Sequence, residues 1–458
     1  MRSRYVLLLA FSVAASYASG QQAYATVDSV LTFKDAVRIA LQNNATLISQ
    51  KNNLVTSKVF KTFRFAQLGP QAGISGSLYQ SNGNRFIQQE AKVVNATVNG
   101  AQASLSVNQP IFNGLSILNG AKASSALLDG QLELVNRTTQ DVITAVSNQY
   151  LQVLLDQELL KIAIENLEAQ KTVLLQVQEY VKVGSRSPVD GYNQQAQVSN
   201  AELRVVQAEN TLVNDKTTLF LSLGIDPTLV TRIVEPTWDI NTIALDNIDL
   251  DQMLETALQR RSDLRLARDN EKAAQFNVRA NKGNYFPSLN AFYNNGSAYN
   301  QVKGVDSSDP AYRNFNDQFF TDNRSNSFGV SLNIPIFSGF QNRYLFIQSK
   351  MAYENSKAQR QLREVTVKSD VLRAYENLQS VQKAYAAGLT GLEASKMAYE
   401  LERERYNLEV TSFVDFATAN RTFIQAQTDM AQAKYRILFQ KILLDYALGT
   451  LKPEDLPQ

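Results

Sequence analysis

Two short stretches of sequence decide the fold: SVNQPIFNG at residues 106–114 and SLNIPIFSG at residues 331–339. Each begins with alternating apolar and polar residues and ends in Pro-Ile-Phe, one further residue and a glycine. Proline fixes φ and lacks a backbone donor, so we expect it to end a strand and redirect the chain. The glycine relieves crowding at the bend. We therefore predict two strand-to-helix junctions, built on Pro110, Gly114, Pro335 and Gly339.

The two stretches belong to a duplicated unit. They are 225 residues apart, and SPVD at residues 187–190 is followed at the same separation by SFVD at residues 412–415. Self-similarity of this kind indicates a repeat, here of roughly 220 residues. We expect a leader at 1–20, a first repeat at 21–223, a linker at 224–249, a second repeat at 250–447 and a tail at 448–458.

The first twenty residues have the pattern of a secretory signal peptide. Arg2 and Arg4 precede an apolar run at 5–15, and the small residues at 18–20 suit cleavage before Gln21. These arginines are two of the 45 basic residues, so the rest of the chain has 43 basic and 43 acidic residues. A nucleic-acid-binding protein normally has a basic excess, so we expect an exported protein without a nucleic-acid partner.

The composition excludes most catalytic chemistry. The chain has neither Cys nor His, which excludes disulfides, thiol nucleophiles, imidazole catalysis and His/Cys metal sites. A pair of carboxylates could still serve a glycosidase. However, the acidic residues are spread along helix faces, where charges are usually solvated or packed. We therefore predict no catalytic residue, no metal, no cofactor and no enzymatic activity.

Each repeat contains alternating segments typical of strands. In 101–108 and 327–334 the apolar residues fall on every second position, and the positions between them are mostly Ser, Asn, Gln or Gly. We expect hairpins at about 70–111 and 287–336. Such strands suit a barrel with lipid outside and water inside, or else a soluble sandwich. Flanking long helices and the lack of a covering sheet favour the barrel. Because four strands cannot close one, several copies would have to form a ring.

Long helical patterns follow each junction, at 115–183 and 340–408. Sixty-nine residues at about 1.5 Å each would extend for roughly 100 Å. Helical patterns at about 33–68 and 250–285 precede the strands, and a return helix is expected at 189–223. Apolar residues recur every seven positions on the return helices, which indicates a coiled coil, either as a wall of helices or as an ordinary bundle core. The fold class is mainly α with a small β part: a duplicated helical-hairpin coiled coil plus four strands per chain.

The repeated S-x-N-x-P-I-F-x-G and a pattern at the expected helical tips resemble the TolC family of outer-membrane efflux and secretion channels. The tip pattern, Y/F-x-x-G-x-x-x-x-x-D, corresponds to residues 181–190 and 406–415. The resemblance covers nearly the whole chain after the leader. It implies a homotrimer with a twelve-stranded β-barrel in outer-membrane lipid and a long periplasmic tunnel. It also implies a periplasmic adaptor (membrane fusion protein) and an inner-membrane transporter of the RND, ABC or MFS type as partners.

The tips depart from the family pattern at Val181, where an aromatic residue is usual, and at Glu409, where Gly is usual. The resemblance implies that an adaptor contacts the tips. The candidate contact residues are Gly184, Ser185, Arg186, Val410 and Thr411.

Three tip residues are candidates for a periplasmic gate. In a threefold ring Asp190 and Asp415 would each become three carboxylates at the narrow inner end, favouring cations. The resemblance also implies that Tyr406 belongs to the gate. The alternative is local: Ser187 and Ser412 would cap their helices, and the aspartate three residues later would complete a capping box.

The favoured function is an outer-membrane channel subunit of a tripartite efflux or type I secretion system. It would pass small molecules or polypeptides outward without chemistry. The alternative is an exported coiled-coil scaffold or adhesin without a pore. The polar strand faces favour the channel, because a scaffold needs no hydrated lumen.

Overall fold

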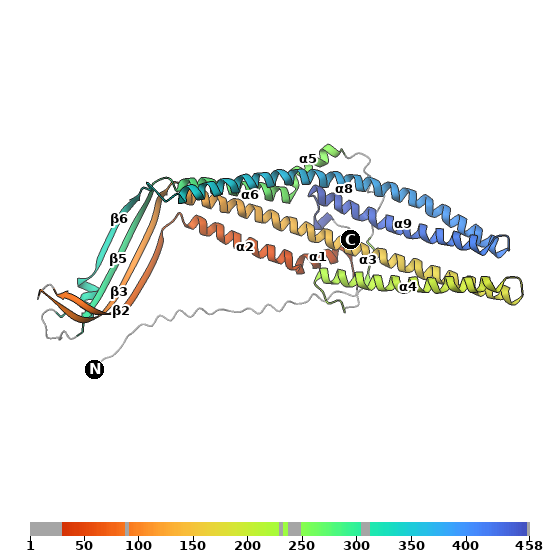
Figure 1. Cartoon of the computed structure of the whole chain (residues 1–458), viewed down its shortest axis with the longest axis horizontal. Helices are drawn as coiled ribbons and strands as arrows, with labels where there is room; N and C mark the ends of the chain where they lie inside the picture. Colours follow the sequence, from red (N-terminus) through yellow and green to blue (C-terminus); the bar gives the residue numbers. More distant parts are fainter. Residues whose placement is uncertain (1–29, 88–90, 229–231, 237–248, 304–311, 456–458) are drawn as a thin grey trace.

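The computed structural model describes residues 30–87, 91–228, 232–236, 249–303 and 312–455. The expected signal peptide and most of the expected linker lie outside these ranges. The molecule is elongated, with a strand sheet at one end, helices along its length and two helical turns at the other end (Figure 1). Within the described ranges, no helix combines the length and the apolar character that crossing a membrane would require.

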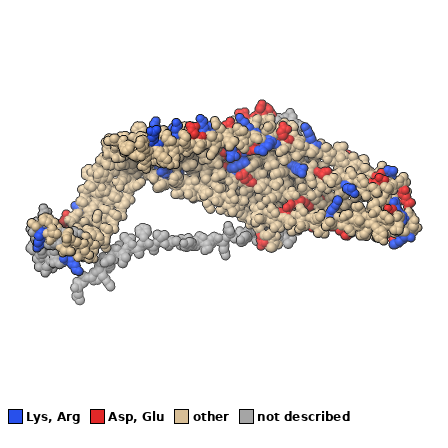
Figure 2. Space-filling view, in the orientation of Figure 1, with Lys and Arg blue, Asp and Glu red and all other residues tan. Residues whose placement is uncertain are grey.

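Four antiparallel strands form the sheet, in the order β2 (Gln71–Ile87), β3 (Lys92–Asn113), β5 (Ser288–Val302) and β6 (Ser325–Asn333). The strands are longer than the sequence pattern indicated. Arg85 and Lys92 are the charged residues within them, both beside the β2–β3 turn. The space-filling view accordingly shows charges along the helices and almost none along the strands (Figure 2).

The register of the sheet confirms the predicted alternation. Ile74 pairs with Leu105, and Ser75 pairs with Ser104, which pairs in turn with Gly296. One face is therefore mostly apolar, and the other is mostly Ser, Asn, Gln and Gly. On the apolar face Ile74 is 84% exposed, Leu78 86% and Phe328 83%. The described residues leave these three side chains largely uncovered, although the Phe315 ring lies 5.1 Å from the ring of Tyr299 on the same face.

Each junction turns the chain with two consecutive residues of positive φ. These are Gly114 (63°) with Leu115 (62°), and Gly339 (59°) with Phe340 (63°). The expected role of Pro110 needs correction, because β3 continues past it to Asn113. A register shift between Pro110 and Phe112 allows the ladder to continue without the missing donor.

Helices α3 (Ser116–Lys182) and α8 (Gln341–Asn407) each have 67 residues and begin and end within one residue of the prediction. Helices α4 (Pro188–Leu223) and α9 (Phe413–Leu448) return from the far turns. They are shorter than α3 and α8, so they end near the middle of the molecule. The other half of each long helix packs on a helix that leads into the sheet.

The helices that lead into the sheet are not continuous, contrary to the prediction. The first is divided into α1 (Phe33–Asn43) and α2 (Ala45–Ala66), and the second into α5 (Leu250–Arg260) and α6 (Ser262–Gly283). At the first break Asn44 is extended, and its side chain accepts a hydrogen bond from the Leu47 amide at 3.0 Å. Arg261 occupies the equivalent break in the second repeat.

The largest buried core lies at this level, midway along the helices. A two-strand parallel pair crosses it, β1 (Val30–Leu31) with β4 (Arg232–Ile233), which the sequence analysis did not anticipate. Tyr150 joins the pair to α3, since its hydroxyl donates to the carbonyl oxygens of Leu31 at 2.9 Å and of Val234 at 2.6 Å. Short turns α7 (Phe315–Asp317), η2 (Gln318–Asp322) and η3 (Pro453–Asp455) complete the described elements.

Candidate functional site at the helical tips

The two tips have the same backbone turn, although their sequences differ. Gly184 follows α3 with φ of 75°, and Glu409 follows α8 with φ of 61°. In each tip the next residue donates its amide to a carbonyl five residues back, Ser185 to Tyr180 and Val410 to Arg405, both at 2.9 Å. Glu409 therefore adopts the left-handed conformation that glycine adopts more easily. The departure from the sequence pattern does not change the shape of the turn.

The return helices begin with capping serines. Ser412 accepts a hydrogen bond from the Asp415 amide at 3.2 Å, and its hydroxyl donates to the Asp415 carboxylate at 2.7 Å. The Ser412 hydroxyl is the main cause that holds the pKa of the exposed Asp415 below its usual range. Ser187 instead accepts from the Val189 amide at 3.2 Å, so the local capping interpretation describes the second tip better than the first.

Side chains of one tip contact the other tip within the same chain. The Ser185 hydroxyl donates to the carboxylate of Glu409, and the Arg186 guanidinium donates to the carbonyl oxygen of Tyr406. The same guanidinium lies 3.8 Å from the centre of the Tyr406 ring, in cation–π geometry. We call Ser185, Arg186, Tyr406 and Glu409 the tip clasp.

Tyr406 lies inside the helical packing and is 2% exposed. Its ring stacks on Phe416 with centres 4.9 Å apart, and Phe413 approaches edge-on at 6.2 Å. Burial raises the pKa of its phenol, Arg186 lowers it and Asp190 raises it. Its hydroxyl has no hydrogen-bond partner among the described residues. In the single chain, the ring of this gate candidate therefore lies between the hairpins.

The other candidates are distributed over both tips. Asp190 is half-buried in the first turn of α4, near enough to Tyr406 to act on its pKa. Asp415 instead interacts within its own tip, where the Thr411 hydroxyl also donates to it at 3.3 Å. Gly184 and Val410 are exposed. The structure thus brings Ser185, Arg186 and Tyr406 together and leaves Asp415 apart.

The role of Glu409 in the clasp is not apparent from the sequence, where this residue is only a replacement for the usual glycine. The sequence signal was its position, 225 residues after Gly184. No sequence pattern indicated that the two turns would be in contact.

A second polar site lies midway along the helices, at the break between α5 and α6. The guanidinium of Arg261 is almost fully buried and donates to both carboxylate oxygens of Asp263, at 2.9 and 2.7 Å. It also donates to Asp370 at 3.1 Å and to the carbonyl oxygen of Ala447 at 3.2 Å. This network joins the helix break to α8 and to the end of α9.

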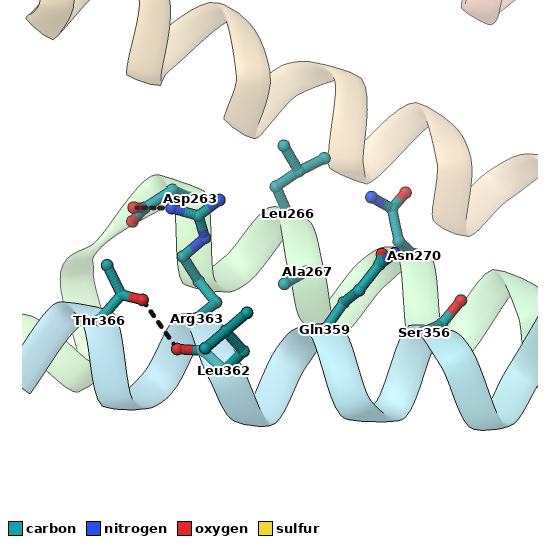
Figure 3. Close-up of a pocket in the computed structure, with 9 residues that line it drawn as sticks. All are labelled: Asp263, Leu266, Ala267, Asn270, Ser356, Gln359, Leu362, Arg363 and Thr366. Carbon is teal, nitrogen blue, oxygen red and sulfur yellow. Dashed lines mark hydrogen bonds and ion pairs between the residues drawn. The ribbon is translucent and has the colours of Figure 1, made fainter.

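A pocket of about 270 Å³ adjoins this network between α6 and α8. Figure 3 shows Asp263 beside Arg363, an ion pair with a 3.7 Å separation, and Asn270 and Gln359 along the same gap. The described residues include no group of three or more acidic side chains placed to hold a metal ion. The arrangement suits a structural joint, since each charge near the pocket is already paired.

Comparisons with known proteins identify the family of this chain. A family model described as outer membrane efflux protein matches residues 36–225 and 253–450. The outer membrane protein TolC of Vibrio cholerae is 24% identical over 322 residues, covering 69% of this chain and 70% of that protein. TolC of Escherichia coli is 22% identical over 393 residues, covering 84% of this chain and 76% of that protein.

A solved structure shows the same fold. The outer membrane channel CmeC of Campylobacter jejuni superposes with a TM-score of 0.78 at 16% identity, covering 91% of this chain and 85% of that chain. The family model matches two segments that together contain most of the chain, and each segment holds one helical hairpin and its strands. This chain belongs to the outer membrane efflux protein family.

Proposed function

We propose that three copies of this chain form an outer-membrane efflux channel, with a twelve-stranded barrel in the lipid and a helical tunnel in the periplasm. The sheet carries the proposal. Its edge strands β2 and β6 each lack a partner on one side within the described chain, and its apolar face is exposed. Lipid does not tolerate unpaired backbone groups, so β2 of one copy would pair with β6 of the next. The polar face would then line a hydrated lumen.

The helices support the same ring. On α2, Val55, Val59 and Phe63 are exposed at four-residue spacing, which is one face of a helix. On α8, apolar side chains are exposed near the strand junction, among them Tyr344 and Ile347. Among the described residues, no side chain covers these exposed apolar residues of α2 or of α8. We infer that α2 of one copy packs on α8 of the next copy, in the same way that β2 of one copy would pair with β6 of the next.

Cross-linking tests this arrangement directly, because the chain has no cysteine of its own. Val59 and Ile347 lie at similar distances from the ends of α2 and α8 at the junction. A Val59→Cys, Ile347→Cys double variant treated with a short bis-maleimide should give covalent dimers and trimers. Val59→Cys with Leu401→Cys, which lies near the tip, is the matched control. Monomers alone from both variants, with no conductance in planar bilayers, would count against the trimeric channel.

The tips would form the inner end of the tunnel. We propose that Asp190, Tyr406 and Asp415 contribute to a periplasmic gate there, with the tip clasp joining the two hairpins of each copy. Tyr406 would act from within the helical packing, by holding Arg186, because its ring is not exposed. Asp190 and Asp415 would supply carboxylates that attract cations.

The gate has its own electrophysiological test. An Asp190→Ala, Asp415→Ala channel should lose cation preference and change its conductance relative to wild type. Asp429→Ala, an exposed carboxylate farther along α9, should do neither. A double variant that matches wild type in both properties would refute the gate.

The exposed residues of the tips offer a surface for a partner protein. We propose that a periplasmic adaptor contacts Gly184, Ser185, Arg186, Val410 and Thr411, and that it connects the channel to an inner-membrane transporter of the RND, ABC or MFS type. Small molecules or polypeptides would then pass outward. Isolation of the cross-linked complex from cells with a photoreactive group at Val410 tests this contact. An adaptor captured there, but not from the same group placed at Leu203 in α4, is the expected result.

A further inference from the structure

Two aromatic side chains lie on the polar face of the sheet, and each stands directly opposite a glycine. Tyr79 of β2 pairs with Gly100 of β3, and Phe292 of β5 pairs with Gly329 of β6. The alternation of the strands places all four residues on the face that carries Ser75, Ser104 and their neighbours. We call these two contacts the ring-on-glycine pairs.

The rings occupy the space that a side chain on the glycine would need. A Cβ atom on Gly100 would lie 2.3 Å from Cζ of Tyr79, and one on Gly329 would lie 2.9 Å from Cζ of Phe292. Carbon atoms in contact stay about 3.5–4.0 Å apart, so neither position has room for a methyl group unless the ring moves. Each ring therefore lies across the neighbouring strand instead of standing upright from the sheet.

A hydrogen bond holds the Tyr79 ring in this position. Its hydroxyl donates to Oδ1 of Asn300 at 2.8 Å, on the strand beyond Gly100. The backbone of Asn300 is held in turn by Gln318, whose side chain accepts from its amide and donates to its carbonyl oxygen, both at 3.1 Å. Tyr79 is 43% exposed, so one side of the ring is covered and the other is open.

We propose that Gly100 and Gly329 set the width of the lumen at two levels, by allowing these aromatic rings to lie flat on its wall. The inference rests on the proposed function, because it requires the polar face to line a lumen. Phe292 pairs with Asn108, eight residues along β3 from Gly100, so the two pairs are about 27 Å apart along the strand direction at about 3.4 Å per residue. Three copies would place three rings at each level.

The mechanism is steric. With alanine at position 100, Tyr79 must leave the strand surface, and its other staggered rotamers remain on the same face of β2. The ring would then project into the lumen and lose its hydrogen bond to Asn300. Gly73 lies on the same face of β2, but a Cβ there would meet nothing within 4 Å. It is the matched control.

The experiment measures which polyethylene glycols enter the barrel. Wild-type and variant full-length channels are inserted in planar bilayers, and polymers of graded size are added on the barrel side alone. Gly100→Ala and Gly329→Ala should each exclude smaller polymers than wild type, whereas Gly73→Ala should behave as wild type. Removing the ring as well, in Tyr79→Ala with Gly100→Ala or in Phe292→Ala with Gly329→Ala, should restore entry.

The outcomes separate the two proposals. If no variant and no wild-type protein forms channels, the proposed function fails. If channels form but Gly100→Ala and Gly329→Ala keep the wild-type size limit, the further inference fails and the channel stands. Each substitution is also introduced into the Val59→Cys, Ile347→Cys background, where a variant that does not assemble is recognised by the loss of the cross-linked trimer. In that case Tyr79→Ala alone decides. It should admit larger polymers than wild type, and an unchanged size limit would overturn the role of the ring.

Discussion

The guanidinium of Arg186, at the end of the first long hairpin, lies 3.8 Å from the centre of the Tyr406 ring at the end of the second. The two residues are 220 positions apart in sequence. Their contact joins two turns that each repeat forms independently. The charge of Arg186 is unpaired by any carboxylate among the described residues, so the ring and the carbonyl oxygen of Tyr406 are what hold it.

Replacing Arg186 should loosen the tips. An Arg186→Gln variant loses the cation–π contact, worth about 0.5–2 kcal/mol. We expect faster amide hydrogen exchange in the last turn of α8 and at the start of α9. Arg204→Gln, an exposed arginine in α4, should leave the exchange there unchanged. Equal protection in both variants would show that the clasp does not hold the tips.

The two junction glycines should respond differently to the same substitution. Both have positive φ, so alanine costs about 1–2 kcal/mol at either position. A Cβ on Gly114 would also lie 2.1 Å from the carbonyl oxygen of Gly283, whereas one on Gly339 meets nothing within 4 Å. We therefore expect Gly114→Ala to reduce the free energy of unfolding by about 1–3 kcal/mol more than Gly339→Ala. Denaturant titration measures the difference, and equal losses would contradict the clash.

Stability should depend on pH through Asp156. Burial, then the neighbouring carboxyl of Asp215, raises its pKa from 3.8 to about 7. An acid with a raised pKa in the folded state binds a proton that the unfolded chain releases. Its contribution to stability is therefore complete below about pH 4 and is lost as pH rises to about 7 and beyond.

The amide in Asp156→Asn mimics the protonated carboxyl. The variant and wild type should be equally stable at low pH, and the variant should be more stable above pH 7, by an amount on the order of a few kcal/mol. Asp429→Asn replaces an exposed carboxylate, so its stability relative to wild type should not change with pH in this way. Thermal unfolding midpoints from pH 4 to pH 8 test this, and a constant difference between Asp156→Asn and wild type would refute it.

Among the charged residues, replacing Arg261 should reduce the free energy of unfolding most. It is 1% exposed and joins two carboxylates to the end of α9. Removing one partner of a buried ion pair leaves uncompensated charge and costs about 3–5 kcal/mol. Arg261→Met should lower the free energy of unfolding by that amount. Arg38→Met, which breaks an exposed pair with Asp35, should cost no more than about 1 kcal/mol. A small loss in the free energy of unfolding of Arg261→Met would mean that α6 and α8 stay packed together without this residue.

Local signals predicted the long helices best. The left-handed pair at each junction and the capping serine at each tip act within a few residues, so the ends of α3 and α8 could be predicted closely. The heptad pattern predicted helical packing. However, Val206 and Val213, which are seven positions apart on the return helix α4, remain about 60% exposed in the single chain.

The breaks in the helices that lead into the sheet and the continuation of β3 past Pro110 were not predicted correctly. Asn44 is a common helix-capping residue, yet the helical pattern on both sides of it indicated one continuous helix. Its equivalent, Arg261, has no capping side chain, and the α5–α6 break is held by contacts with Ala447 and Asp370. The ladder past Pro110 depends on β5, which lies about 180 residues later in sequence.

The sequence by itself determined the duplication, the four alternating strands, the long helices and the family, because each follows from periodicity or from motifs of a few residues. Only the tertiary structure decided that the tips clasp each other, that Tyr406 is buried and that two aromatic rings lie flat on glycines. Those features depend on distances between residues far apart in sequence. Such distances are set by the packing of whole helices and by strand register, which no local pattern encodes.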